Sequence, residues 1–266
     1  MIDKVYILNI ESEQERRENA MEHLSDIGVP VSKIEIWDAK TCAPYAKTAD
    51  LCAAAGETLP IFRNLLASGN YKECYITYLA QAWSYLSFWQ HLQRTGETAI
   101  LMHDDVDFLC SFENVLKACD KLPKDVFFAF LSFAREAPID VSQIVSYDEP
   151  WIRYVDDRFQ WDAVMLFTSS GSDLLLSEFN KLDWLGDGWF MNGIWRNEFF
   201  DGCGGIYELA VNPNKLTQTR EALTSMVTTP PRYETEFSSV TNNDLAFPTV
   251  IRDSDSRLLR SKESTN

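Results

Sequence analysis

The chain has 266 residues, of which 45% are hydrophobic and 13% aromatic, so it can bury the core of one large domain. Its formal net charge of -16 repels the phosphates of nucleic acids and of anionic lipids. Nucleic acid and membrane surfaces are therefore disfavoured as partners.

The chain begins with "MIDKVYILNI", where an acid and a lysine precede a short apolar run, unlike the long apolar stretch of a signal peptide. No segment reaches the ~18 uninterrupted apolar residues that a membrane span requires. The six cysteines include no C-x-x-C pair, which favours reduced thiols over a zinc or redox centre. These features predict a cytoplasmic protein without a transmembrane segment.

The first hundred residues predict strands that alternate with helices. "KVYILNI" favours a strand, and residues 11–28 follow as a helix that ends at Gly28. Residues 32–39 alternate in polarity as a second strand, whereas residues 40–70 mix short helical and loop signals without a clear order. Residues 75–96 carry apolar side chains on more than one face, which predicts a largely buried helix.

The remainder continues the alternation. It predicts an apolar strand that ends at "ILMHDDVDF", a helix over 111–123, a strand over 125–133, and a strand, turn and helix over 159–180. This order predicts an α/β fold with a mainly parallel central sheet flanked by helices. The composition turns polar near Thr228, so we expect a domain over residues 1–227 and a polar tail or arm over 228–266.

The stretch "ILMHDDVDF" places polar residues directly after an apolar strand. These residues are His103, Asp104, Asp105 and Asp107. Ligands of open α/β sheets bind outside the carboxyl ends of the strands. Carboxylates held close together repel one another, and a hard divalent cation that takes oxygen ligands relieves this repulsion. Such a cation also allows an acidic site to accept a diphosphate.

Two other interpretations of these acids remain open at this point. The carboxylates can simply be solvated at the start of the helix that begins near Ser111, where the helix dipole favours negative charge. Alternatively, Asp105 and Asp107 can form the Asp-x-Asp pair of a hydrolase that uses an aspartate nucleophile. Leu109 and the position of the motif in mid-chain speak against the hydrolase.

Several motifs occur in a fixed order from about residue 4 to 226. They are "VYILNIESEQERRENAMEHL" with Asn9 and Arg16, "IEIWDA" with Asp38, "LAQAWSYLSFWQHL" with Ser84 and Trp89, "ILMHDDVDF", "WDAVMLFTSSGSDLLL", "LGDGWF" with Asp187, and "GIYELAVNPNKLTQ" with Gln218. In their order and spacing these segments resemble glycosyltransferase family 25, the lipopolysaccharide and collagen-type sugar transferases.

The resemblance implies a GT-A type fold, a nucleotide-sugar donor and a divalent metal, Mn²⁺ or Mg²⁺. It implies metal ligands at Asp105, Asp104 and His103, with His103 standing at the family's glutamate. It further implies donor-binding roles for Asn9, Arg16, Asp38, Asp104 and Gln218, and UDP-hexose as the usual donor. Asp187 is the candidate base for an inverting transfer, and Asp183 and Asp162 compete for that role.

The acceptor implied by the resemblance is a hydroxyl of a glycan or of a lipid-linked sugar, as in lipopolysaccharide synthesis. The sequence departs from the family pattern at several positions. These are Ser12, Ala39, Ala80, Gln81 and Tyr85. The alternative hypothesis is therefore a family member without turnover that binds a nucleotide or a sugar.

Overall fold

The computed structural model describes residues 2–108, 111–120, 122, 126, 128–131, 144–148, 151–154, 164–183, 185, 206–209 and 227–228. Its strands are β1 (Lys4–Asn9), β2 (Ile34–Asp38), β3 (Ala99–His103), β4 (Asp107–Phe108), β5 (Phe128–Phe130), β6 (Ile144–Asp148), β7 (Trp151–Tyr154), β8 (Val164–Phe167), β9 (Ile206–Leu209) and β10 (Val227–Thr228). Its helices are α1 (Gln14–Asp26), α2 (Thr48–Gly56), α3 (Pro60–Ser68), α4 (Ile76–Thr95), α5 (Phe112–Cys119) and α6 (Ser169–Phe179), with 3-10 turns at Val31–Lys33 and Asn70–Glu73.

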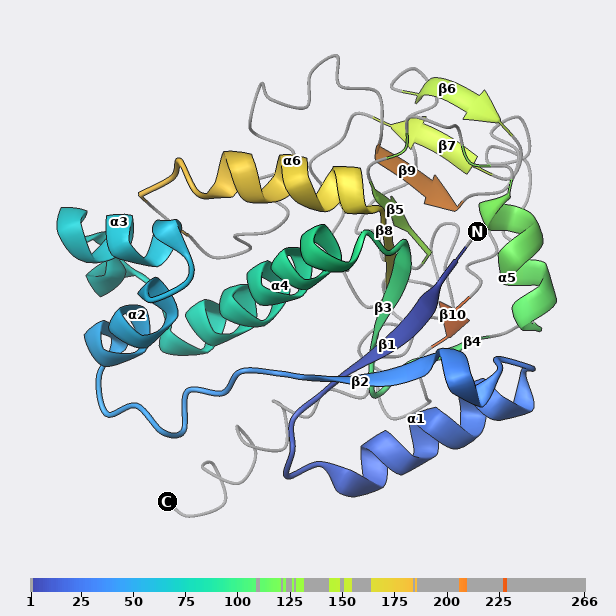
Figure 1. Ribbon diagram of the computed structural model, residues 1–266, viewed down its shortest axis with the longest axis horizontal. Coiled ribbons are helices and arrows are strands. Elements are labelled where there is room, and N and C mark those ends of the chain that lie inside the picture. Colours follow the sequence, from blue (N-terminus) through green and yellow to red (C-terminus); the bar gives the residue numbers. More distant parts are fainter. Residues whose placement is uncertain are drawn as a thin grey trace, which may run out of the picture.

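The strands among these residues form a large mixed sheet in the order β2-β1-β3-β8-β5-β9-β7-β6 (Figure 1). β1 pairs in parallel with β2 and β3, and β5 pairs in parallel with β9. β8 is antiparallel to both β3 and β5, and β7 is antiparallel to β6 and β9. The predicted α/β fold with a central sheet flanked by helices is confirmed, and its parallel pairs are β1 with β2, β1 with β3, and β5 with β9.

The sheet separates two apolar cores, which follows from the alternation of side chains along its strands. In β1, Tyr6 faces a core shared with α2, α3, α4 and α6, whereas Val5 and Ile7 face a core shared with α1 and α5. Figure 1 shows α4 and α6 on one side of the sheet and α1 on the other. β1 is therefore covered on both faces, as expected of a central parallel strand.

Helix α4 lies in the core, with several of its large side chains fully buried. Its fully buried side chains include Tyr85, Phe88 and Trp89. Gly96 ends the helix with a φ of 74°, a left-handed conformation that glycine adopts without strain. The prediction of a buried helix over 75–96 is confirmed, and Trp89 belongs to its buried face.

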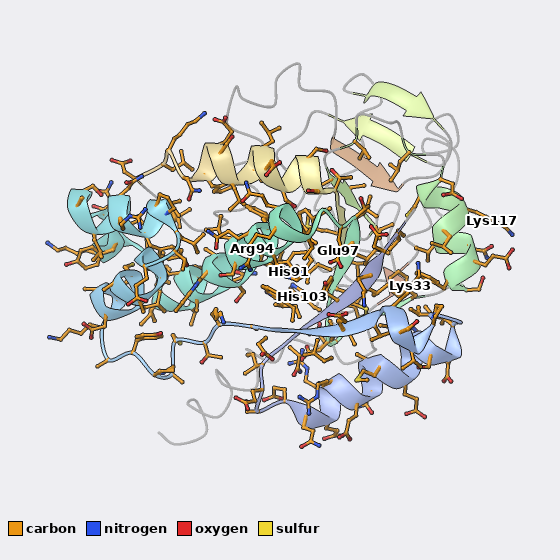
Figure 2. The ribbon with its side chains drawn as sticks, in the orientation of Figure 1. Lys33, His91, Arg94, Glu97, His103 and Lys117 are labelled. Atoms are coloured by element: carbon orange, nitrogen blue, oxygen red, sulfur yellow. The ribbon has the colours of Figure 1, made fainter. Side chains whose placement is uncertain are left out.

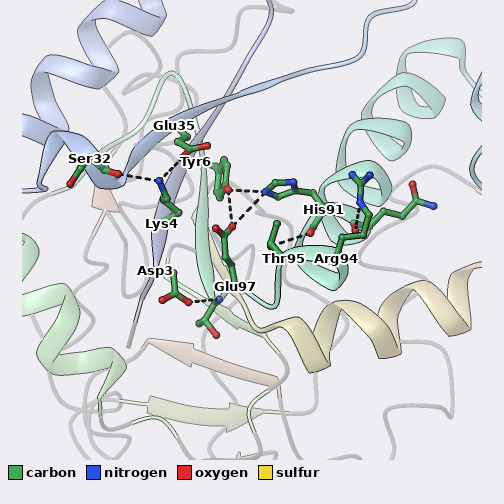
Figure 3. A network of polar contacts seen from close by, with 11 residues as sticks. Asp3, Lys4, Tyr6, Ser32, Glu35, His91, Arg94, Thr95 and Glu97 are labelled. Carbon is green, nitrogen blue, oxygen red and sulfur yellow. Dashed lines mark hydrogen bonds and ion pairs between the residues drawn. The ribbon is translucent and has the colours of Figure 1, made fainter.

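A polar network ties β1 to the last turns of α4 and to the start of β3 (Figure 3), and Figure 2 labels two of its members, His91 and Glu97. The Tyr6 hydroxyl donates to Glu97 Oε2 at 2.8 Å and lies 2.8 Å from His91 Nε2. Burial, reinforced by Glu97, raises the pKa of the Tyr6 phenol. Beside it, the Thr98 amide donates to Asp3 Oδ2 at 2.9 Å. The network fixes how α4 leads into β3.

Further observations bear on the remaining sequence predictions. Of the cysteines that the structure describes, Cys42, Cys52, Cys74 and Cys119 form no disulfide with one another. In the part of the chain that the structure describes, no helix is both long and apolar enough to cross a bilayer.

β10 pairs antiparallel with β4, so Val227 lies opposite Phe108. Beyond Thr228, the predicted polar tail lies outside the described residues.

Candidate functional site

The carboxyl ends of three neighbouring strands meet at one edge of the sheet. Because β1 is parallel to β2 and β3, Asn9 lies opposite Asp38 and Leu8 lies opposite His103. Asp104, Asp105 and Val106 follow β3 directly, and we call residues 104–106 the acid turn. The structure thus brings Asn9 and the predicted acids together at the edge where α/β sheets bind ligands.

Asp104 is held by both of its carboxylate oxygens. Oδ2 accepts a 2.6 Å hydrogen bond from Asn9 Nδ2, and Oδ1 accepts one from Arg16 Nη2. The same Asn9 amide donates to the Glu13 carbonyl at 3.0 Å, which ties β1 to the start of α1. The side chain of Asp104 is only 6% exposed. Asn9 and Arg16, predicted as donor-binding residues, therefore also orient this carboxylate.

Asp105 is buried as deeply as Asp104, but one of its carboxylate oxygens has no hydrogen bond from a described residue. Arg16 Nη2 lies 3.0 Å from Asp105 Oδ2, and the Asp105 side chain is 5% exposed. Oδ1 is buried and accepts no hydrogen bond from a described residue. One guanidinium therefore serves two buried carboxylates, and one carboxylate oxygen is left without a polar partner among the described residues.

Burial dominates the electrostatics of both acids. Desolvation raises the pKa of Asp104, although Arg16 and the Asn9 hydrogen bond oppose the shift. Desolvation also raises the pKa of Asp105, from an ordinary value of 3.8 to about 6, against the opposing effects of His103 and Arg16. Arg16 thus compensates only part of the unfavourable burial of negative charge.

The stability of the metal-free protein should therefore depend on pH through Asp105. Because the folded form binds this proton more tightly than the unfolded chain, the stabilisation is complete below about pH 4 and is lost as pH rises through about 6. A pKa of about 6 in the folded protein, against 3.8 in the unfolded chain, corresponds to about 3 kcal/mol in the free energy of unfolding. Urea unfolding in the presence of a chelator, from pH 4 to 8, measures this free energy.

The appropriate comparison is with Asp105→Asn, which keeps the shape of the side chain and removes the titrating group. The wild type should lose stability relative to this variant as pH rises, and the difference should level off near pH 7. A difference that stays constant across the range would show that Asp105 does not titrate as its burial requires.

His103 contacts a residue that also departs from the family pattern. Its Nε2 lies 2.9 Å from the hydroxyl of Tyr85, which is fully buried on α4. The hydrogen bond links the end of β3 to α4 and engages the ring nitrogen at Nε2. The sequence identified Tyr85 and His103 separately as departures from the resembling pattern, but it did not predict their contact. The signal that could have predicted it is that one lies on the helix and the other at the strand end that follows it.

The end of β2 is fixed to the same helix. The Ala39 amide donates to the Asn9 carbonyl at 2.8 Å, and the Lys40 amide donates to Ser84 Oγ at 2.8 Å. Trp37 Nε1 donates to the Ser84 carbonyl at 3.1 Å. Asp38 is exposed beside these contacts. Ser84, a position that matches the family pattern, thus holds the loop that leaves β2.

Several predicted residues lie outside the described part of the chain. They are Asp187, Gln218 and Asp162. Asp183 is described, and it is exposed with its backbone carbonyl accepting a 2.8 Å hydrogen bond from Asn70 Nδ2. The backbone of Asp107 lies in β4. The candidate site is therefore built here from the ends of β1, β2 and β3, α1 and α4.

At this site, one buried carboxylate oxygen among the described residues is left to bind a divalent cation. Among the described residues, no group of three or more histidine, cysteine, aspartate or glutamate side chains is arranged to hold a metal. Asp104 is engaged by Asn9 and Arg16, whereas Asp105 Oδ1 is a buried oxygen without a hydrogen bond. Mg²⁺-like ions are commonly held by one or two carboxylates together with substrate phosphates and water. The donor set fits that type of coordination.

No protein-family model matches the sequence, and no curated protein matches it in sequence. Among solved structures, the fold is similar to mouse xyloside xylosyltransferase 1 in its apo form, with 9% identity, a TM-score of 0.46, and 95% of this chain and 96% of that chain covered. It is also similar to the apo bifunctional glycosyltransferase WbbM, with 12% identity, a TM-score of 0.40, and 73% of this chain and 37% of that chain covered. At these TM-scores the likenesses carry no argument about the site.

Proposed function

We propose that the chain is a metal-dependent glycosyltransferase of GT-A type that transfers a hexose from a UDP-linked donor to the hydroxyl of a glycan or lipid-linked acceptor. One observation carries the proposal. Two adjacent carboxylates are buried at the carboxyl end of β3, and one of their oxygens has no hydrogen bond from a described residue. Buried charge arranged in this way is unfavourable for the protein alone and suits a cationic ligand.

In this proposal, Asp105 would hold Mn²⁺ or Mg²⁺ through Oδ1, together with donor phosphates and water. A cation held there would supply positive charge to offset the charge that develops on the diphosphate leaving group. Asp104 fixes the side chains of Asn9 and Arg16. Arg16 Nε is buried without a hydrogen bond to a described residue, so it keeps a donor for a phosphate oxygen.

The acceptor side of the proposal comes from the sequence resemblance. Transfer forms a bond from the acceptor oxygen to the anomeric carbon and breaks the bond to the diphosphate. A carboxylate takes the proton of the attacking hydroxyl, and Asp187 is the proposed base of this inverting step. Gln218 and Asp38 are proposed contacts to the donor.

The direct test incubates the purified protein with Mn²⁺ and a panel of nucleotide sugars and measures released nucleoside diphosphate. We expect release from one donor, with UDP-hexoses first, and suppression by a chelator. A simple phosphoester in the same panel tests the hydrolase hypothesis, which predicts phosphate release without preference for nucleotide sugars.

Calorimetric titration of the same donors separates the remaining outcomes. Binding without release, even when acceptor sugars are supplied, would support the alternative function of a nucleotide or sugar binding module. The Tyr85 hydroxyl engages Nε2 of His103 at 2.9 Å, so this nitrogen does not bind a metal while the contact holds, which supports the alternative. Absence of donor binding would refute the assignment of the donor site.

A further inference from the structure

Helix α1 contacts the acid turn and the segment after it along one face. Arg16, Ala20, His23 and Ile27 are spaced by four, three and four residues, so they share a stripe that runs from α1 into the residue that caps it. Arg16 pairs with Asp104 and Asp105 at one end of the stripe. At the other end, the Ile27 carbonyl accepts a 2.8 Å hydrogen bond from the amide of Phe112.

His23 lies between these two contacts and binds the backbone. Its Nε2 accepts a 2.7 Å hydrogen bond from the amide of Phe108, the third residue after Asp105. A backbone amide can only donate, so Nε2 accepts through its lone pair and carries no proton in this contact. Only an imidazole in this form can make the contact.

The hydrogen bond fixes the chain at the point where it leaves the acid turn. Phe108 is buried with Val106, Leu24 and Phe112 in the core between the sheet and α1. On the other side of the turn, β3 is fixed by its pairing with β1. The acid turn is thus fixed at both ends, by the pairing of β3 with β1 and by the hydrogen bond from the Phe108 amide to His23.

We propose that His23 is a positioning residue for Asp105, acting through the amide of Phe108. Arg16 sets the charge balance of the acid turn and His23 sets its backbone path. Both side chains come from one helix, seven residues or about 10.5 Å apart along its axis. The role in metal and donor binding rests on the proposed function, whereas the contact with Phe108 does not.

Two variants separate the hydrogen bond from the volume of the side chain. His23→Gln presents an oxygen acceptor at the reach of Nε2, and His23→Met has a similar length without a good acceptor. We expect amide hydrogen exchange at Phe108 to accelerate at least ~10-fold in His23→Met and to stay near the wild-type rate in His23→Gln, because exchange follows local opening. Exchange at Leu101, inside β3, should be unchanged in both and serves as the control.

The functional readout is a calorimetric titration of the protein with Mn²⁺ in the presence of UDP. Loss of a group that orients a metal ligand typically weakens metal binding ~10–100-fold, so His23→Met should bind Mn²⁺ ~10-fold more weakly. His23→Gln should restore the affinity to within ~3-fold. A purely space-filling role would not be rescued by glutamine in this selective way.

Each possible result tests either the positioning role of His23 or the proposed function. Unchanged Phe108 exchange in His23→Met would overturn the positioning role, as would equal losses in the Met and Gln variants. If His23→Met fails to fold, His23→Asn replaces it, because its shorter side chain keeps polarity but does not reach Phe108. If the wild type binds neither Mn²⁺ nor UDP, the proposed function fails, and the exchange data still decide whether His23 holds the amide.

Discussion

Asp105→Asn is expected to reduce metal-dependent release of nucleoside diphosphate by at least ~100-fold. The side chain keeps its shape but loses the charge of the oxygen that has no hydrogen bond from a described residue. An amide oxygen is a weaker ligand for a hard cation than a carboxylate, and even residues that only orient a ligand are worth ~10–100-fold. The measurement is nucleoside diphosphate release with Mn²⁺ and the preferred donor.

The matched control is Asp173→Asn. Asp173 is exposed on α6, which follows β8, and β8 runs antiparallel to β3, so α6 starts at the opposite edge of the sheet. This control removes one negative charge without touching the acid turn and should keep wild-type activity. Retained metal-dependent release in Asp105→Asn would refute the assignment of Asp105 as the metal ligand.

Arg16→Met is expected to destabilise the metal-free protein by about 3–5 kcal/mol at pH 7, because removing one partner leaves buried charge uncompensated. Arg16 is 11% exposed in its side chain and is the cation paired with both Asp104 and Asp105. Urea unfolding in chelator gives the change in the free energy of unfolding. Adding Asp105→Asn should recover part of the loss, and the non-additivity measures the coupling.

The adjacent Arg17 provides the control for this prediction. It lies on the same helix and, within the described part of the chain, makes no ion pair with an acid. Arg17→Met should change the free energy of unfolding by less than about 1 kcal/mol, as is usual for surface positions. Equal effects of the two substitutions would show that the paired acids are not what Arg16 stabilises.

The local part of the fold could be predicted from the sequence. β1, α1, β2 and α4 follow from hydrophobic periodicity and from the terminating glycines at 28 and 96. The hairpin of β6 and β7 and the short strand β9 were not predicted, because they are brief and are stabilised by pairing with distant segments. The antiparallel insertion of β8 between β3 and β5 likewise depends on long-range pairing.

The candidate site, like the fold, could be predicted from the sequence only in its local part. The acids at the end of an apolar strand were visible in "ILMHDDVDF", since strand ends are where an α/β sheet binds ligands. The double pairing of Arg16 and the amide contact of His23 were not, because each joins residues more than 80 positions apart in the chain. Helical spacing shows that positions 16 and 23 share a face, but only the folded chain shows what that face meets.

The contact between Tyr85 and His103 constrains how such a chain can change over evolutionary time. Tyr85 on α4 and His103 at the end of β3 are in hydrogen-bonding contact, with 2.9 Å between the tyrosine hydroxyl and Nε2 of the histidine. Substitutions at the two positions should therefore be epistatic, and they should covary among relatives. The order in which they arise matters, because a mismatched intermediate leaves a polar group unsatisfied beside the acid turn.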